Sequence, residues 1–363
     1  MSLFSKAGIS IVEYREHGNF VDLILDKAVD SVQFKELYNK LLDEYHILMF
    51  QLKSYYPIIR LTNYRSGKST LYTYRWVLTS LTIVTVFLTG FALSSGLQQV
   101  LNLSFNISDI LINSALYTTV FLASLISHEI GHLAISKRTG IRSEGPILIP
   151  APPLQLGFIG TLGAIILTKT PPCTRKDLAK LGLMGPLLGF TVSLLFGLLG
   201  VYLSPVVPPS AAERLVEEGA LSPLQVASLS FYLLTLLKNE GVLVVHPVLF
   251  SSYVIHLVTF LNLLPIGQLD GGHVVRSAVG PRPFKTIGAV IPMILLTAGV
   301  ALTIMGLNGI YYIGIGLITL VLYSIMGRRG HPGVANQLDE SKCNICIVLY
   351  FVLLILTVPI PFA

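Results

Sequence analysis

Charged residues are scarce in this chain of 363 residues, because Asp, Glu, Lys and Arg together make up only 12% of it. Soluble domains carry roughly twice that fraction. Hydrophobic residues amount to 53%, and the mean hydropathy is +0.72. The composition therefore excludes an ordinary soluble protein and predicts a polytopic α-helical membrane protein that is embedded in a lipid bilayer.

Cysteine is scarce as well, and three residues cannot build a disulfide framework. Two of them form a Cys-x-x-Cys segment, Cys343 to Cys346, where a basic stretch meets the last apolar run. We interpret them as paired thiols at a membrane boundary that have no further role. The weaker alternative is that these two cysteines form half of a metal site or a redox site.

A basic face is also missing, although the formal net charge is +6 and the pI is about 9.1. Lys and Arg gather in short clusters between apolar runs, so we expect no nucleic-acid partner. The apolar runs predict six to seven transmembrane helices, several of them near the length of about 20 residues that a bilayer crossing needs. The candidate spans are 76–96, 113–136, 181–203, 245–264, 285–305, 309–326 and 345–361.

The basic clusters predict the orientation of these spans. If the spans alternate, all five clusters fall on one side, and the positive-inside rule makes that side cytoplasmic. Two glycosylation sequons, at Asn102 and Asn106, lie in the first loop on the opposite side. The apolar stretch 224–237 is too short to cross comfortably and is expected to be an interfacial or re-entrant helix. The clusters comprise Arg60, Arg65, Lys68 and Arg75; Lys137, Arg138 and Arg142; Lys169, Arg175, Lys176 and Lys180; Arg276, Arg282 and Lys285; and Arg328 and Arg329.

Residues 1–68 lack the cleavable apolar core of a signal peptide and are predicted to form a small soluble α/β domain on the cytoplasmic side. We expect strands at 9–16 and 20–26, a helix capped by Ser31 and a third strand at 47–56. A membrane core at 75–327 follows, and then a cytoplasmic linker with a C-terminal transmembrane helix at 328–363. The absence of a transit peptide makes the cell membrane the expected location.

The second span contains the pentad His128-Glu129-Ile130-Gly131-His132. Two histidines four residues apart lie on one face of a helix, one turn apart, which suits a zinc ion, and Glu129 beside them is a candidate general base. A charged side chain in hydrocarbon costs roughly 2.5 kcal/mol or more. The pentad therefore predicts a functional metal site inside the membrane.

A third ligand is expected from another span at the same depth, because catalytic zinc usually has three protein ligands and one open position. The fourth span runs in the same direction as the second. Pro265 and several glycines break it, and the break brings Asp270 to the same leaflet. Asp270 is the favoured third ligand and His273 is the alternative. His246 and His256 lie earlier in this span and are interpreted as histidines that are hydrogen-bonded between helices.

The pentad and the motif Asn-x-x-Pro-x-x-x-x-Asp-Gly, which begins at Asn262, together resemble the site-2 protease family of intramembrane zinc metalloproteases, peptidase family M50. The resemblance extends to 146–153, 156–164, 185–189 and His246-Pro247, a set most similar to the archaeal and plastid-type branch. It covers roughly residues 75–327. Many family members have Asn where Gly189 stands here.

This resemblance implies a zinc metalloendopeptidase that cleaves membrane-protein substrates within or near their transmembrane segments. One zinc ion would be held by His128, His132 and Asp270, and Glu129 would take a proton from the attacking water. Asn262 is placed to hydrogen-bond the scissile carbonyl or to orient the site. Its alternative role is that of a buried residue that joins two helices.

Residues 141–167 are apolar, contain Pro and Gly, and are flanked by basic clusters on the same side, so they are expected to enter the membrane and return. We predict a re-entrant strand hairpin whose edge pairs with an unwound substrate. The equal alternative is that Pro150, Pro152 and Pro153 only turn the chain. A transporter or channel is the rival class for the whole protein, because broken membrane helices with polar residues also mark ion paths. The sequence leaves the substrate and the oligomeric state open.

Overall fold

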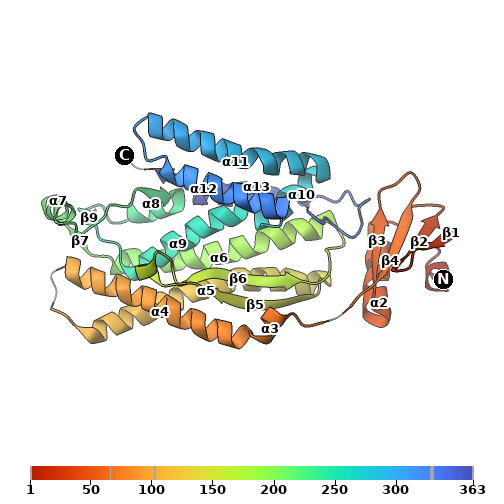
Figure 1. The fold of residues 1–363 in the computed structure, drawn as a ribbon, viewed down its shortest axis with the longest axis horizontal. Coiled ribbons are helices and arrows are strands. Elements are labelled where there is room, and N and C mark those ends of the chain that lie inside the picture. The colour runs from red at the N-terminus through yellow and green to blue at the C-terminus, as the bar shows by residue number, and fades with distance from the viewer. Residues whose placement is uncertain (1, 66, 102–103, 328–330, 362–363) are drawn as a thin grey trace.

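The computed structural model describes residues 2–65, 67–101, 104–327 and 331–361. The basic pair Arg328 and Arg329 and the sequon at Asn102 lie outside the described residues. The elements of the chain fall into an N-terminal α/β domain, a bundle of apolar helices, and short elements at the far end of that bundle (Figure 1).

The N-terminal domain is a four-stranded antiparallel sheet in the order β1-β2-β4-β3 with a helix packed against it. Its core lies between the sheet and the apolar face of α2, which buries Phe34, Leu37, Tyr38, Leu41 and Leu42. The elements are α1 (Ser2–Lys6), β1 (Ile11–Glu16), β2 (Phe20–Leu25), α2 (Ser31–Tyr45), β3 (Ile47–Leu52) and β4 (Ile58–Asn63).

Two details of this domain differ from the sequence prediction. Strand β4 was not predicted, although it lies between β2 and β3 and completes the sheet. Its Arg60, counted above as a topology signal, pairs with Asp22 on β2 through two hydrogen bonds of 2.8 Å. The cap of α2 is Asp30 rather than Ser31, because the Asp30 carboxylate accepts from the backbone N–H groups of Val32 and Gln33.

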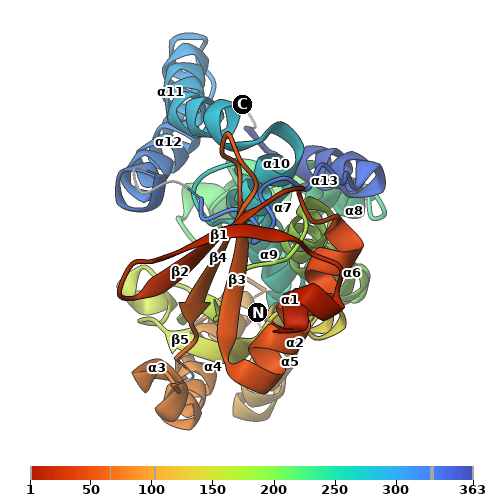
Figure 2. The ribbon, with the colours of Figure 1, turned by 90° about the vertical axis from the view of Figure 1, so that its right-hand side faces the viewer.

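Apolar helices occur at all seven of the predicted spans. Four are long and apolar enough to cross a membrane, and the other three are shorter. The long helices are α4 (Arg75–Val100), α5 (Ile107–Thr139), α6 (Arg175–Leu203) and α11 (Pro281–Ile304), and the shorter ones are α9 (Pro247–Leu263), α12 (Ile310–Leu322) and α13 (Asn344–Thr357). Figure 2 shows that α11 and α12 form a hairpin that projects from the rest of the bundle.

A β-hairpin follows α5, as the sequence predicted. It consists of β5 (Ser143–Pro150) and β6 (Thr161–Thr168), which pair in antiparallel register with an irregularity at residues 145–146. The turn contains the 3₁₀ helix η1 (Leu154–Leu156). Strand β5 packs along α4, so β6 forms the outer strand of this two-stranded sheet, next to α5.

The stretch 224–237 was predicted to be an interfacial or re-entrant helix, and the structure makes only part of it helical. Only α8 (Leu229–Thr235) is helical within it, and β8 (Val226–Ser228) precedes that helix and pairs with β10 (Pro359–Pro361). Ser228 ends the strand and caps the helix by accepting from the Phe231 N–H. The remaining elements are α3 (Thr70–Thr73), β7 (Val206–Val207), α7 (Pro209–Glu217), β9 (Val242–Leu243), α10 (Asp270–Val279) and the π-helical turn η2 (Tyr323–Gly327).

Cys343 and Cys346 differ from their prediction as free thiols, because they form a disulfide just before and within the first turn of α13. The pair has a sequence separation of three, so the bond closes a single turn. The third cysteine, Cys173, is free and buried.

The N-terminal domain is fastened to the bundle by contacts from several segments. Lys35 on α2 forms an ion pair of 2.8 Å with Asp177 on α6, and Arg142 forms one of 2.7 Å with Asp43. Residues 335–339, which we call the strap, run beside β3 and exchange backbone hydrogen bonds with Gln51. The domain therefore lies at the end of the bundle where α5 ends and α6 begins, which is also where four of the basic clusters lie (Figure 1).

Helices α5 and α6 pack closely against each other where Gly131 faces α6. A Cβ atom at Gly131 would overlap the backbone carbonyl of Met184 and would lie 2.9 Å from the Cα of Gly185. The obstacle is backbone, which cannot rotate aside as a side chain can. The pentad therefore carries a glycine between its histidines because the next helix passes directly over that position.

We predict that Gly131→Ala destabilises the folded protein by about 2 kcal/mol, because it forces two helix backbones apart. Gly96→Ala on α4 is the matched control, since nothing lies within 4 Å of a Cβ there, and it should leave stability unchanged or slightly raised. The midpoint of thermal unfolding in detergent measures both. Equal midpoints for the two variants would contradict the predicted contact.

Candidate metal centre

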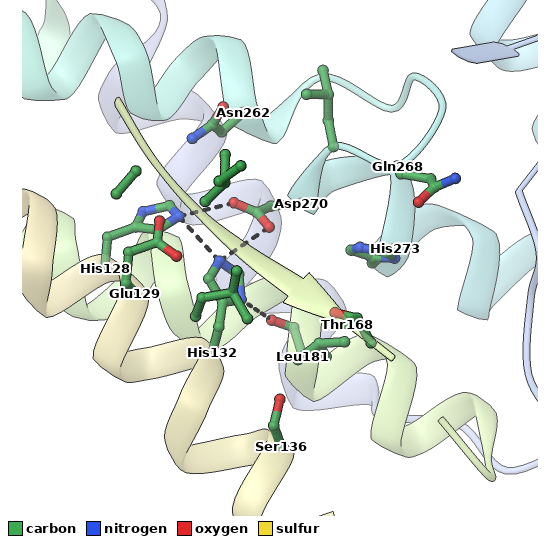
Figure 3. A pocket seen from close by; sticks show the side chains of 14 residues that line it. His128, Glu129, His132, Ser136, Thr168, Leu181, Asn262, Gln268, Asp270 and His273 are labelled. Atoms are coloured by element: carbon green, nitrogen blue, oxygen red, sulfur yellow. Dashed lines mark hydrogen bonds and ion pairs between the residues drawn. The ribbon is translucent and has the colours of Figure 1, made fainter. Parts of the chain in front are cut away.

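Three side chains from two separate parts of the sequence converge between α5 and the start of α10 (Figure 3). His128 and His132 project from α5, and Asp270 is the first residue of α10. The His128 Nε2 atom lies 3.1 Å from one Asp270 carboxylate oxygen, and His132 Nε2 lies 3.2 Å from the other. The two Nε2 atoms are 3.1 Å apart. All three potential ligand atoms thus lie within 4.8 Å of one another.

The orientation of His132 is fixed by a backbone carbonyl on α6. Its Nδ1 atom lies 2.8 Å from the Leu181 oxygen, so the neutral ring donates its proton there and carries a lone pair on Nε2. That lone pair faces the Asp270 carboxylate and the second imidazole. Such a set of electron-pair donors fits a cation between them, and two histidines with one carboxylate suit zinc.

Asp270 reaches this position because the helix before it is broken. Helix α9 ends at Leu263, and the chain turns through Pro265 and Gly267, the latter with φ of +53°, before α10 begins. The Leu263 carbonyl, released at the end of the helix, accepts a hydrogen bond of 2.9 Å from the Tyr350 hydroxyl on α13. A backbone break inside an apolar bundle is therefore satisfied by protein, as such a break requires.

Glu129 lies beside the histidines and is only 4% exposed. Its side chain lines a cavity of about 210 Å³ that also contains the three convergent side chains. We call this the metal cavity. A buried carboxylate at the wall of such a cavity, next to a candidate metal position, has the placement that a general base requires.

Two glycines of α6 make room for the histidines. A Cβ at Gly185 would overlap the His132 ring, with the Cδ2 atom at 2.6 Å. A Cβ at Gly189 would lie 2.8 Å from the Cβ of His128. The position at which many family members carry Asn is therefore too close to α5 here to accept a side chain without movement of one of the helices.

The other residues singled out in the sequence lie as follows. Asn262 on α9 lines the metal cavity. His273 also lines it but pairs with His331, with Nδ1 and Nε2 2.7 Å apart, and is outside the convergent group. His256 contacts the hydroxyls of Ser228 and Ser230, and His246 accepts from the Val248 N–H as the cap of α9. Neither of these two histidines is among the residues that line the metal cavity.

Sequence reasoning missed several residues around the metal cavity. Gln268, in the turn before Asp270, lines the metal cavity, and so does Thr168 of β6. Ala164, Ile165 and Ile166 of β6 also line it; they belong to the hairpin predicted at 141–167, but none of them was singled out as a residue of the site. Gln268 stands inside the motif that begins at Asn262, so its position in the sequence was a usable signal. The orienting Leu181 carbonyl had no signal, because every residue carries one.

Comparison with known proteins shows the family to which the chain is similar. The family model for peptidase family M50 matches residues 116–306, more than half of the chain. EGY2 of Arabidopsis thaliana, named as a probable chloroplastic zinc metalloprotease, is 26% identical over 65% of this chain and 40% of its own length. EGY1 of the same plant, similarly named, is 29% identical over 46% of this chain and 30% of its own.

A bacterial relative is also similar. Rip3 of Mycobacterium tuberculosis, named as a zinc metalloprotease, is 26% identical over 57% of this chain and 42% of its own length. The chain thus spans less than half the length of each of these curated relatives. No solved structure matches it significantly. The matched segment includes α9, the start of α10 and the whole His-Glu-x-x-His pentad, and the chain belongs to peptidase family M50.

Proposed function

We propose that this protein is an intramembrane zinc metalloendopeptidase that hydrolyses peptide bonds within or near the transmembrane segments of membrane proteins. The observation that carries the proposal is the convergence of His128, His132 and Asp270, with the buried Glu129 beside them, among long apolar helices. Membership of a peptidase family and the names of the relatives support it. They do not favour the transporter alternative.

The residues divide the chemistry between them. His128, His132 and Asp270 would hold one zinc ion, which supplies a Lewis acid that activates water and polarises a peptide carbonyl. The Glu129 carboxylate takes the proton from the attacking water and returns it to the leaving amide nitrogen. The Asn262 side-chain amide, at the wall of the metal cavity, donates a hydrogen bond to the scissile carbonyl.

Strand β6 is proposed to hold the substrate. A helical segment hides its amide bonds in its own hydrogen bonds, so the segment must unwind before cleavage. Pairing with a strand edge replaces those hydrogen bonds. Strand β6 is the outer strand of its hairpin, and its residues 164–166 and 168 line the metal cavity. An unwound substrate added to that edge would run past the convergent side chains.

The membrane arrangement proposed here has seven spans and places the N-terminal domain in the cytoplasm. It rests on the seven apolar helices and on the basic clusters gathered at the end that carries this domain. We propose the cell membrane as the location and the N-terminal domain as a part separate from the peptidase core. The C-terminal linker and α13 then return the chain from the cytoplasmic side.

We predict that Glu129→Gln lowers the cleavage of a single-span model substrate by about 100-fold or more, because the amide cannot accept the proton. Bound zinc should remain near one ion per chain, since Glu129 is outside the convergent group. Gel-based cleavage and elemental analysis of the purified protein measure the two quantities. Glu217→Gln on α7 is the control for the substitution itself. Undiminished cleavage by the Glu129 variant would refute the proposal.

A second prediction separates metal binding from folding. Gly185→Ala should leave the bundle folded, because the atoms that its Cβ meets belong to the side chain of His132, which can rotate. The displaced ring cannot keep both its Leu181 contact and its place beside Asp270. We therefore expect bound zinc and cleavage to fall together by about tenfold or more, while Gly314→Ala, a helical position with nothing within 4 Å, retains both. Full zinc occupancy in the Gly185 variant would contradict this placement of His132.

A third prediction concerns the edge of β6. Ile166 lines the metal cavity and has no register partner on β5. Ile166→Pro removes its backbone N–H, so substrate pairing should weaken and kcat/KM should fall by about tenfold, with zinc content unchanged. Ile166→Ala keeps the N–H and should have a smaller effect. If Ile166→Ala lowers kcat/KM as much as Ile166→Pro does, the loss comes from side-chain packing, and the strand-pairing prediction is wrong.

A further inference from the structure

A second cavity, of about 520 Å³, lies where the N-terminal domain meets the helical bundle. Cationic side chains from four separate parts of the chain line it. Lys53 follows β3, Arg175 begins α6, Arg276 lies on α10 and Arg282 is near the start of α11. Gln337 of the strap lines the same space. We call it the basic cavity, and its residues take no part in the peptidase chemistry proposed above.

These four cations have no anionic partner in the part of the chain that the structure describes. No acidic side chain lines the basic cavity, and none of the four side chains has an ion pair or hydrogen bond to a carboxylate there. The nearby Asp339 is already engaged, because its oxygens accept from the Ser31 hydroxyl, the Ser341 hydroxyl and the Arg175 backbone N–H. The positive charge of the basic cavity is therefore uncompensated.

Arg276 shows the cost of this arrangement. Its Nε atom is buried without a hydrogen-bond partner, and the charge of Arg175 acts on it. Burying a hydrogen-bond donor without a partner costs free energy, and the cost is larger when the donor belongs to a charged group than when it belongs to a neutral one. An anion in the cavity would offset the repulsion between these like charges. The forked N–H groups of a guanidinium fit the oxygens of a phosphate group.

A third cavity, of about 250 Å³, continues from the basic cavity toward the membrane helices. The two share Arg276, Arg282 and Pro281. The additional lining includes Phe284 and Tyr323 from α11 and η2. An anionic head in the basic cavity thus has this third cavity beside it, in which Lys285 and His331 accompany the apolar side chains, at the end of the bundle where the basic clusters gather. Basic pockets between membrane helices on that side suit anionic head groups.

We propose that the basic cavity binds a phosphate-bearing anion that joins the N-terminal domain to the bundle. Lys53 belongs to the domain, and the three arginines belong to the bundle, so one phosphate would be contacted from both parts. The phosphate can belong to an anionic phospholipid head group or to a soluble polyphosphate. The apolar side chains of the third cavity favour the lipid. Binding does not depend on the metal cavity.

The test uses the full-length chain in nanodiscs of phosphatidylcholine, with two probes. Phosphatidylglycerol is added in one arm and retained lipid is counted by native mass spectrometry; pyrophosphate is titrated calorimetrically in the other. We expect the wild-type chain to retain phosphatidylglycerol over phosphatidylcholine, or to bind pyrophosphate, and Arg276→Gln/Arg282→Gln to weaken that binding by about tenfold or more. Retention in the lipid arm identifies a lipid, and binding in the pyrophosphate arm alone identifies a soluble ligand.

The control is Lys176→Gln/Lys180→Gln at the start of α6, which removes the same net charge from residues that do not line the basic cavity. It should bind as the wild type does. If Arg276→Gln/Arg282→Gln fails to fold, Arg276→Lys/Arg282→Lys takes its place. That variant keeps the positive charge but loses the forked guanidinium N–H groups, so its binding should weaken several-fold. Absence of binding to both probes, or an equal loss in the Lys176/Lys180 control, would overturn the proposal.

Discussion

The contact between α5 and α6 is the constraint on which the metal centre depends. A methyl group on Gly131 would overlap the backbone of α6, and a methyl group on Gly185 would overlap the side chain of His132 on α5. This closeness brings the Leu181 carbonyl within 2.8 Å of the His132 ring. One interhelical contact thus sets the position of a histidine, its orientation and the nitrogen on which its proton lies. Bulk at Gly185 would displace His132 from Asp270, whereas bulk at Gly131 would force the two helix backbones apart.

Several ionisable groups that are buried among the apolar helices have polar partners. The carboxylate of Asp270 lies between two imidazoles, and the break that delivers it is closed by the hydroxyl of Tyr350. Outside the metal cavity, two serine hydroxyls contact Nδ1 of His256, while its Nε2 atom is buried without a partner. Polar groups in an apolar bundle are expensive unless they are paired, so their placement constrains neighbouring helices as strongly as apolar packing does.

The end of the bundle that carries the N-terminal domain brings several parts of the chain together. The domain is joined there by ion pairs to α6 and to the start of the hairpin, and by the strap beside β3. The strap comes from the last tenth of the sequence, so segments that are far apart in sequence meet at this point. The basic cavity lies at the same junction. A ligand there would act on domain position, at a distance from the proposed chemistry.

The sequence by itself determined the apolar spans, the shared face of His128 and His132, and the hairpin after α5. These features follow from periodicity and composition, which can be read from each segment of the sequence without knowledge of its neighbours in space. Asp270 was predicted from the broken span and its direction, and the structure does place it with the histidines. The tertiary structure alone decided that β4 completes the sheet, that the Leu181 carbonyl orients His132, and that Lys53 meets Arg276 across a cavity. Each of these joins segments distant in sequence, and the physical reason is that such contacts depend on how whole elements pack rather than on the pattern within any one of them.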